Sequence, residues 1–241
     1  MPAKLHRVGG EGPPVLLIHG FGADRMGWVA NTPALMERHS VWAIDLPAHG
    51  EAEPEPSSPT EMARDIADRV SKLDGPLALI GHSLGGAIAA QMVADDPSRY
   101  GAVVLLAPAA FGSGPPDASF LEGFARLETE GEALALLGRL VERKRLIQPP
   151  MAQYVLAHLA KPGRREALAE IGKAAMSFVR PPLPENALVI WGEKDSINRP
   201  DPVLFEQLGD RAVLLPDTGH LPQVEAATRV NRLILDHLSA D

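Results

Sequence analysis

The sequence contains no cysteine, so neither a disulfide bond nor a thiol nucleophile is available to it. Aromatic residues make up only 5% of the chain, and the formal net charge of −8 opposes binding to nucleic acid or to an anionic membrane. No apolar run is long enough to span a membrane, and no apolar stretch typical of an export signal follows the first charges. We therefore expect a soluble cytoplasmic protein with no nucleic-acid or membrane partner.

Sequence signals for bound cofactors are also missing. None of the eight histidines is paired at the spacing of a metal-binding motif, and no glycine-rich nucleotide motif occurs. We expect neither a metal nor a cofactor. The 241 residues are enough for one domain, or for a core with one insertion, and the sequence does not indicate an oligomeric state.

Short apolar runs alternate with amphipathic stretches through most of the chain. This alternation predicts the α/β class, with a mostly parallel sheet and helices on both of its faces. Thr60 is the expected N-cap of the second helix, and Pro33 is expected to kink or restart the first. Strands are predicted at residues 15–18, 41–45, 77–80, 102–106, 187–191 and 212–215, and helices at 24–37, at 61–73, directly after residue 83 and at 223–237.

The alternation breaks between residues 109 and 186, where amphipathic helical runs replace the strands. We therefore predict an α/β core formed by residues 1–108 and 187–241, with 109–186 as a helical lid over the carboxyl ends of the strands. Most apolar side chains in this insertion are expected to pack against one another. They form two stripes, Leu134, Leu137, Leu140 and Val141, and Met151, Val155 and Leu159. For Met151, Tyr154 and His158, core packing is favoured over the alternative that they face the pocket.

The stretch from residue 77 to 90 combines an apolar run, a Gly-x-Ser-x-Gly pentapeptide centred on Ser83 and an alanine-rich run. This order predicts a buried strand, a sharp turn and a helix. Gly81 and Gly85 remove side chains that would collide where the strand and helix fold back on each other. Ser83 is then exposed at a helix N-terminus, which favours negative charge.

A serine needs a base to accept its proton and a third group to orient that base. Asp195 and His220 each lie in the loop directly after a predicted strand, and the order Ser83, Asp195, His220 is the one expected for this fold. The sequence therefore predicts a Ser-His-Asp catalytic triad. The backbone N–H groups of Phe21 and Leu84 are the expected donors of an oxyanion hole.

These motifs resemble those of the α/β-hydrolase family, over essentially the full chain. The matching landmarks are His-Gly-Phe-Gly at 19–22, Gly-His-Ser-Leu-Gly-Gly at 81–86, Trp-Gly-Glu-Lys-Asp at 191–195 and Gly-His at 219–220. The resemblance implies an α/β-hydrolase fold and an activity on ester bonds, as in small carboxylesterases.

Three further stretches, at residues 105–109, 143–146 and 230–234, resemble the hydrolase-like C-terminal portion of acetoin dehydrogenase acetyltransferase components. Those components carry a lipoyl domain ahead of the hydrolase-like part, whereas few residues here precede the first predicted strand. We expect either a free-standing relative or a chain to which the carrier function does not transfer.

Several polar residues near the predicted site have a structural interpretation. His19 and His82 are expected to shape loops, and Asp45 to hold neighbouring loops rather than to act as the triad acid. Glu193 is a second candidate for that acid because it lies two residues before Asp195.

The predicted lid is basic within an acidic chain: residues 138–180 carry nine basic and three acidic side chains. One hypothesis is that this surface attracts an anionic substrate or an acidic partner, and the alternative is that these are ordinary solvated helix faces. Charge reversal at Arg143 and Arg145 distinguishes the two.

Together these features predict a serine hydrolase that cleaves small carboxylic esters or thioesters through an acyl-enzyme. Two alternatives remain open. The first is hydrolysis of a carbon–carbon bond by the same triad, as in relatives that act on ring-cleavage products. The second is a non-catalytic binding module, against which the intact triad argues. Lid shape and polar lining decide the substrate, and neither is readable from the sequence.

Overall fold

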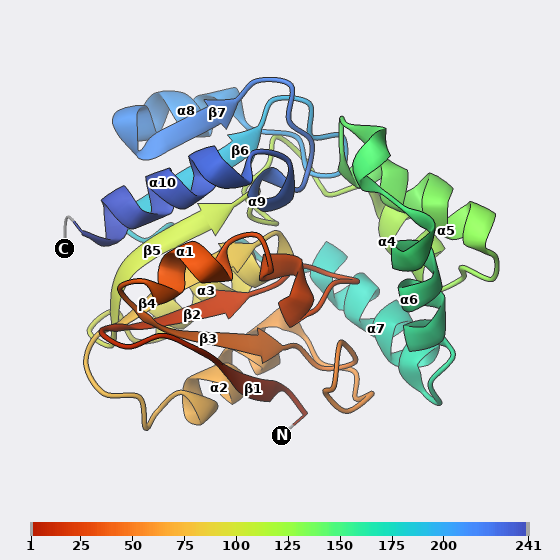
Figure 1. Cartoon of the computed structure of the whole chain (residues 1–241), viewed down its shortest axis with the longest axis horizontal. Helices are drawn as coiled ribbons and strands as arrows, with labels where there is room; N and C mark the ends of the chain where they lie inside the picture. The colour runs from red at the N-terminus through yellow and green to blue at the C-terminus, as the bar shows by residue number, and fades with distance from the viewer. Residues whose placement is uncertain (1, 240–241) are drawn as a thin grey trace.

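A seven-stranded sheet organises residues 2–239, which are the residues that the computed structural model describes (Figure 1). Its order is β1-β3-β2-β4-β5-β6-β7, with β1 antiparallel to β3 and every other neighbouring pair parallel. The predicted mostly parallel sheet is therefore confirmed. The strands are β1 Lys4–Gly9, β2 Pro14–Ile18, β3 Ser40–Asp45, β4 Leu77–His82, β5 Tyr100–Leu106, β6 Ala187–Gly192 and β7 Ala212–Leu215.

Side chains alternate along the central strands and form a separate core on each face of the sheet. In β2, Leu16 and Ile18 join one core, whereas Val15 and Leu17 join the other. All four are fully buried, and each such side chain stabilises the fold by about 2 kcal/mol. Helices α2 (Pro59–Arg69), α3 (Leu84–Asp95) and α8 (Pro202–Leu208) cover the first face, and α1 (Thr32–Met36) and α10 (Ala227–Leu238) cover the second.

Strand β1 was not among the predicted strands. It is an edge strand that pairs only with β3, and no residue of it is fully buried, so it lacks the apolar run that marks the central strands. The predicted helix at 24–37 is instead a short 3₁₀ helix, η1 (Arg25–Trp28), followed by α1. Pro33 lies in the first turn of α1, where its missing N–H is tolerated.

Two helix boundaries also differ from the sequence prediction. The prediction of Thr60 as the N-cap of α2 is wrong, because Ser58 accepts from the Glu61 N–H and the Glu61 carboxylate accepts from the Ser58 N–H. The predicted closing helix is divided into α9 (Pro222–Glu225) and α10 by a break at Ala226.

Residues 109–186, the helical segment, contain no strand and lie beside the carboxyl ends of the parallel strands (Figure 1). Leu137, Val141, Val155 and Leu159 are buried as expected, whereas Met151 is exposed. None of the helices within residues 2–239 is long and apolar enough to span a membrane. The helices here are α4 (Ala118–Phe124), α5 (Glu130–Leu137), η2 (Gly138–Leu140), η3 (Lys144–Leu146), α6 (Pro149–Leu159) and α7 (Arg164–Met176).

Candidate active site

Ser83 lies on the turn between β4 and α3, in a strained backbone conformation. Its φ of 52° and ψ of −116° are rarely adopted by residues other than glycine. The neighbouring glycines make this turn possible: a Cβ on Gly81 would lie 2.4 Å from the Gly85 carbonyl oxygen, and one on Gly85 would lie 2.2 Å from that of Ile18. The close approach of β2, β4 and α3 thus holds the serine side chain out of the core.

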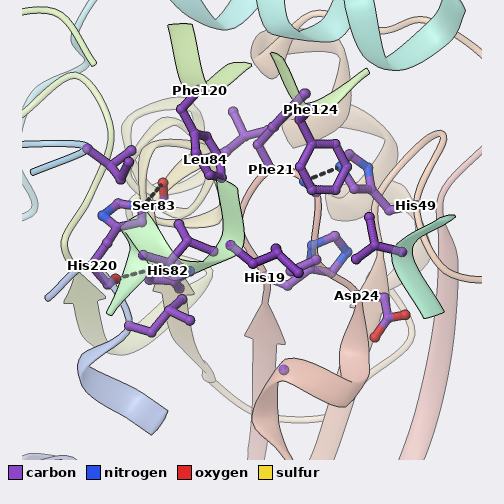
Figure 2. Close-up of a pocket in the computed structure, with 18 of the residues that line it drawn as sticks. His19, Phe21, Asp24, His49, His82, Ser83, Leu84, Phe120, Phe124 and His220 are labelled. Carbon is purple, nitrogen blue, oxygen red and sulfur yellow. Dashed lines mark hydrogen bonds between the residues drawn. The ribbon is translucent and has the colours of Figure 1, made fainter. Parts of the chain in front are cut away.

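The structure brings Ser83, His220 and Asp195 into one chain of hydrogen bonds. Asp195 Oδ2 lies 2.7 Å from His220 Nδ1. Ser83 Oγ lies 3.0 Å from His220 Nε2, a contact that Figure 2 shows. Since an ionised carboxylate only accepts hydrogen bonds, Nδ1 carries the ring proton and Nε2 is free to accept from the serine hydroxyl. These three residues come from the loops after β4, β6 and β7, as the sequence analysis expected.

The carboxylate of Asp195 is held by four donors. Its Oδ1 accepts from the backbone N–H groups of Ile197 and Asn198, both at 2.9 Å, and its Oδ2 accepts from Trp191 Nε1 at 3.0 Å as well as from His220. Burial alone would raise the pKa of Asp195, but the nearby imidazole and the N–H donors hold the pKa below its ordinary value. The group is therefore ionised at neutral pH. Glu193, the other predicted candidate, is exposed and pairs with Lys194.

The backbone of His220 is held from two sides. Its N–H donates to the Leu140 carbonyl in the helical segment at 2.8 Å, and its own carbonyl accepts from His82 Nε2 at 2.8 Å. Burial, together with the neighbouring His220 ring, lowers the pKa of His82 to about 3, so His82 is neutral. His82 thus acts on the loop of His220, in agreement with the loop-shaping role expected for it.

The backbone N–H groups of Leu84 and Phe21, the expected oxyanion-hole donors, belong to segments that adjoin Ser83. Leu84 is the first residue of α3, so its N–H has no intrahelical acceptor. Phe21 follows Gly20, whose Cα lies so near the site that a Cβ there would be 3.0 Å from Ser83 Cβ. The N–H of Phe21 meets no acceptor among residues 2–239. Neither N–H group therefore has a hydrogen-bond acceptor among the residues that the structure describes.

A cavity of about 490 Å³ opens beside Ser83 and is lined mainly by apolar side chains. Figure 2 shows Ser83 and His220 on one side of it and Phe21, Phe124 and His49 grouped on the other. Its volume matches sites that enclose small organic ligands. Met26, Met151 and Tyr154, with exposed fractions between 41% and 55%, also line it. His158 lines the cavity as well. The expectation that Met151, Tyr154 and His158 pack in the core is therefore wrong.

Two buried histidines shape the loops around this cavity as neutral acceptors. His19 Nε2 accepts from the Leu46 N–H at 3.0 Å, and His49 Nε2 accepts from the Gly22 N–H at 2.9 Å. Burial lowers the pKa of His19, and burial together with the neighbouring His19 ring lowers that of His49 to about 3. Neither imidazole contacts Ser83 through a hydrogen bond within residues 2–239, which agrees with the structural role predicted for His19.

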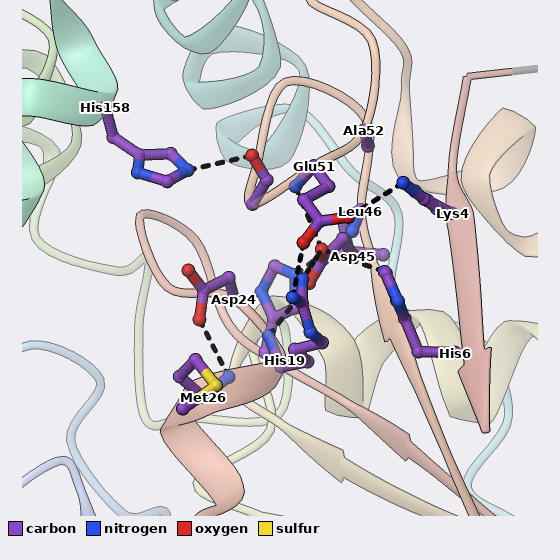
Figure 3. A network of polar contacts seen from close by, with 12 residues as sticks. Lys4, His6, His19, Asp24, Met26, Asp45, Leu46, Glu51, Ala52 and His158 are labelled. Carbon is purple, nitrogen blue, oxygen red and sulfur yellow. Dashed lines mark hydrogen bonds and ion pairs between the residues drawn. The ribbon is translucent and has the colours of Figure 1, made fainter. Parts of the chain in front are cut away.

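Asp45 holds the loops after β3 and β2 together (Figure 3). Its fully buried carboxylate accepts from the Arg25 N–H and guanidinium, at 3.0 and 2.6 Å, and from the Glu51 N–H at 2.9 Å. His6 Nε2 lies 3.1 Å from the same carboxylate. Burial opposes the charge of Asp45, but these donors keep its pKa below the ordinary value. The loop-holding role expected for Asp45 is confirmed.

The helical segment also reaches the rim of the cavity. Tyr154 on α6 donates a short hydrogen bond to the Asp24 carboxylate, and His158 Nε2 donates to the Gly50 carbonyl at 2.8 Å. Burial and the adjacent Asp24 raise the pKa of Tyr154, so the phenol keeps its proton. Helix α6 is thereby joined to the two core loops that border the cavity.

Sequence reasoning missed several residues that hold the site. Glu225 on α9 accepts from the Gly219 N–H at 2.6 Å, and the indole of Trp191 is bonded to Asp195. Trp191 was predicted as the end of a strand and the start of the Trp-Gly-Glu-Lys-Asp landmark, and Glu225 as part of the closing helix. The role of each side chain was not predicted, because it depends on one specific contact in the folded chain.

The comparison with known families agrees with this geometry. The family model described as "Alpha/beta hydrolase family" matches residues 15–233. The chain therefore belongs to the alpha/beta hydrolase family, as its motifs predicted.

One relative is similar over almost the whole of this chain. The chain is 30% identical over 247 residues to the dihydrolipoyllysine-residue acetyltransferase component of the acetoin cleaving system of Cupriavidus necator, covering 98% of this chain and 66% of that protein. It therefore spans slightly less than two thirds of that relative's length.

Two solved structures are similar over almost the whole chain. One is a meta-cleavage product hydrolase from Pseudomonas fluorescens IP01, with a TM-score of 0.83, 21% identity, and coverage of 99% of this chain and 94% of that one. The other is a thermophilic esterase from Thermogutta terrifontis, with a TM-score of 0.77, 27% identity, and coverage of 99% and 93%. The first shows the shared fold alone.

Proposed function

We propose that this chain is a serine hydrolase that cleaves small carboxylic esters or thioesters through an acyl-enzyme, without a cofactor. The observation that carries the proposal is the hydrogen-bonded chain of Ser83, His220 and Asp195 at the wall of an apolar cavity. A serine hydroxyl becomes an effective nucleophile when a base accepts its proton and a carboxylate orients that base. The similarity to an esterase with 27% identity supports the same class.

In the first half of the proposed reaction, Ser83 Oγ attacks the acyl carbonyl while His220 Nε2 takes the hydroxyl proton. Asp195 stabilises the resulting imidazolium through the 2.7 Å bond to Nδ1. The carbonyl oxygen becomes an oxyanion, which the N–H groups of Phe21 and Leu84 bind. His220 then returns the proton to the leaving alcohol or thiol, and the acyl group remains on Ser83.

In the second half, water attacks the acyl-enzyme and His220 accepts a proton from it. The same two N–H groups bind the second oxyanion, the carboxylic acid leaves, and the hydroxyl of Ser83 is restored with its proton. The apolar cavity binds the acyl group, and the strained turn presents the serine to it without rearrangement.

The test is covalent labelling. A fluorophosphonate probe is expected to add to the wild-type protein once per chain, with the adduct located on Ser83 by peptide mass spectrometry. The Ser83→Ala variant is expected to take no label and to lose about four orders of magnitude or more in kcat on a p-nitrophenyl ester. Its free energy of unfolding should stay within about 1 kcal/mol of wild type. A variant that keeps near wild-type esterase activity would remove Ser83 from the mechanism.

A panel of substrates determines which type of bond is cleaved. We expect p-nitrophenyl esters and the matching thioesters of rising acyl length to be hydrolysed, with a limit set by the 490 Å³ cavity. A dienoic ring-cleavage product is the competing substrate, because one similar structure is a meta-cleavage product hydrolase. A kcat/KM for that product well above the values for every ester and thioester would assign the site to carbon–carbon bond hydrolysis instead.

A further inference from the structure

Glu225 is a buried carboxylate that the proposed reaction does not use. Its side chain has no exposed surface, although it lies on α9, a helix of only four residues. Three backbone N–H groups donate to it: Gly219 at 2.6 Å and Glu142 at 3.2 Å to Oε2, and Arg143 at 3.0 Å to Oε1. A buried carboxylate with this many donors is an ordered acceptor, since charge-assisted hydrogen bonds are stronger than neutral ones.

The three donors belong to two segments that are far apart in the sequence. Gly219 immediately precedes His220, whereas Glu142 and Arg143 lie between η2 and η3 of the helical segment. A fourth hydrogen bond joins the same segments directly, because the His220 N–H donates to the Leu140 carbonyl at 2.8 Å. The loop that carries His220 is therefore fastened to residues 140–143, and the Glu225 carboxylate is the side chain that bridges them.

The packing leaves little room for these segments to shift. A Cβ added to Gly219 would lie 2.8 Å from the Leu140 carbonyl oxygen, 2.9 Å from Glu225 Oε2 and 3.0 Å from the Glu142 nitrogen. The backbone of Gly219 thus packs directly against both the carboxylate and the helical segment. The guanidinium of Arg143 lies 3.7 Å from Glu225 Oε1 and partly balances its charge.

We propose that Glu225 is a positioning residue for His220: by tying Gly219 to residues 142 and 143, it holds the imidazole in line between Asp195 and Ser83. This inference rests on the proposed function, since it assigns His220 as the base. Glu225 touches no reacting atom, so its effect passes through the backbone. The geometry also couples the base to the helical segment, because a displacement of residues 140–143 breaks three hydrogen bonds: the one from the His220 N–H to Leu140 and those from the Glu142 and Arg143 N–H groups to Glu225.

The test replaces Glu225 with glutamine, which keeps the shape but converts one acceptor oxygen into a donor. If the NH₂ group takes the place of Oε2, it faces the N–H groups of Gly219 and Glu142. If it takes the place of Oε1, it faces the N–H group of Arg143. We expect kcat of Glu225→Gln on a p-nitrophenyl ester to fall about tenfold to a hundredfold, and KM to change by less than about threefold, because the cavity lining is unaltered. The Nδ1 proton of His220, observed by ¹H–¹⁵N NMR, should shift or broaden relative to wild type.

The matched control is Asp65→Asn. Asp65 is likewise a buried carboxylate that accepts from a backbone N–H, that of Ala3 at 2.9 Å, but it lies on α2 and pairs with Arg69. This variant should lose stability to a similar extent, with kcat and the His220 proton signal as in wild type. A merely structural role of Glu225 predicts the same behaviour for both variants.

Gly219→Ala tests the same contact from its other side, because the added methyl group separates the loop from an intact Glu225 carboxylate. It carries the test by itself where Glu225→Gln does not fold. Folded variants with kcat within about twofold of wild type and an unmoved Nδ1 signal overturn the inference. Failure of fluorophosphonate to label wild-type Ser83 overturns the proposed function instead, and the NMR comparison then still decides whether Glu225 orients His220.

Discussion

Three histidines near the site, His19, His49 and His82, are buried in the neutral form. Charging would remove the acceptor nitrogen of His19 and of His49, whereas His82 donates its hydrogen bond and is kept neutral by burial and the neighbouring His220 ring. Their pKa values lie below the ordinary value of 6.5, and those of His49 and His82 lie at about 3. In the unfolded chain they take up protons below pH 6.5, whereas in the folded chain they do so only at lower pH. The stability they contribute is therefore fully present above pH 6.5 and is lost as the pH falls below 6.5, for His49 and His82 down to about pH 3.

The measurable consequence is a free energy of unfolding that decreases between pH 6.5 and 4.5, by about 1 kcal/mol per pH unit for each of His49 and His82. Urea unfolding at a series of pH values checks this. In His49→Gln the side-chain amide can still accept from Gly22 and donate to the Pro47 carbonyl, but it has no proton to bind in this range. Its slope should be shallower than that of wild type. Identical slopes would show that His49 does not contribute to the pH dependence.

The residues of the proposed triad are predictable from the sequence because each follows an apolar strand at the edge where parallel strands end. Ser83, Asp195 and His220 are brought together by that topology alone, which needs only the order of the elements. The contacts that orient them are not predictable in this way. The hydrogen bond from the Glu142 N–H to the Glu225 carboxylate joins residues that are 83 positions apart in the sequence, and it depends on how the helical segment packs.

At the scale of the helices, the start of α2 shows how a single proline determines which residue caps the helix. Both Ser58 and Thr60 are residue types that cap helices, and Pro59 lies between them. Proline is favoured at the first helical position, so the helix begins at Pro59 and the residue before it becomes the cap. The expected capping role passes from Thr60 to Ser58, which also completes a capping box with Glu61.

A pair of alanine variants measures this boundary. Ser58→Ala should lower the free energy of unfolding by about 1 kcal/mol, because the N–H of Glu61 loses its acceptor. Thr60→Ala, already inside the helix, should change it by less than about 0.5 kcal/mol. Thermal or urea unfolding of the two variants is sufficient. A larger loss in Thr60→Ala than in Ser58→Ala would place the cap where the sequence pattern alone placed it.

The central strands were predictable as apolar runs, but elements shaped by their surroundings were not. Strand β1 has polar residues on its exposed side and exists because β3 offers it an edge. The break between α9 and α10 at Ala226 could not be predicted, because neither glycine nor proline stands at that position. That break allows the carboxylate of Glu225 to point back to Gly219 while α10 continues along the sheet. Tertiary contacts therefore override helical periodicity where the site requires it.

At the scale of the whole molecule, the basic character of the helical segment is largely used within the fold. Arg139 pairs with Asp117, Arg165 donates to the Ala125 carbonyl, and Arg180 stacks on Phe111 at 4.9 Å. Among the lysines and arginines of residues 2–239, only Arg164 lines the cavity. The exposed charges Arg145 and Lys161 lie outside it. Apart from Arg164, the basic side chains of the segment would thus act on an anionic substrate from the surface rather than from inside the cavity.

With the basic side chains at the surface, the hypothesis of an anionic substrate predicts an effect on the rate at which the substrate associates with the protein. Steering by exposed charges raises kcat/KM at low salt and is screened as ionic strength rises, while kcat is unaffected. For a monoester of a dicarboxylic acid we expect kcat/KM to fall about threefold or more between low and physiological salt, and the fall to vanish in Arg145→Glu combined with Lys161→Glu. Lys72→Glu, an exposed charge beyond α2 at the opposite end of β4, is the matched control and should behave as wild type. Equal salt dependence for the anionic ester and a neutral ester of the same leaving group would leave these charges as solvated helix faces, and would make the apolar cavity alone responsible for substrate choice.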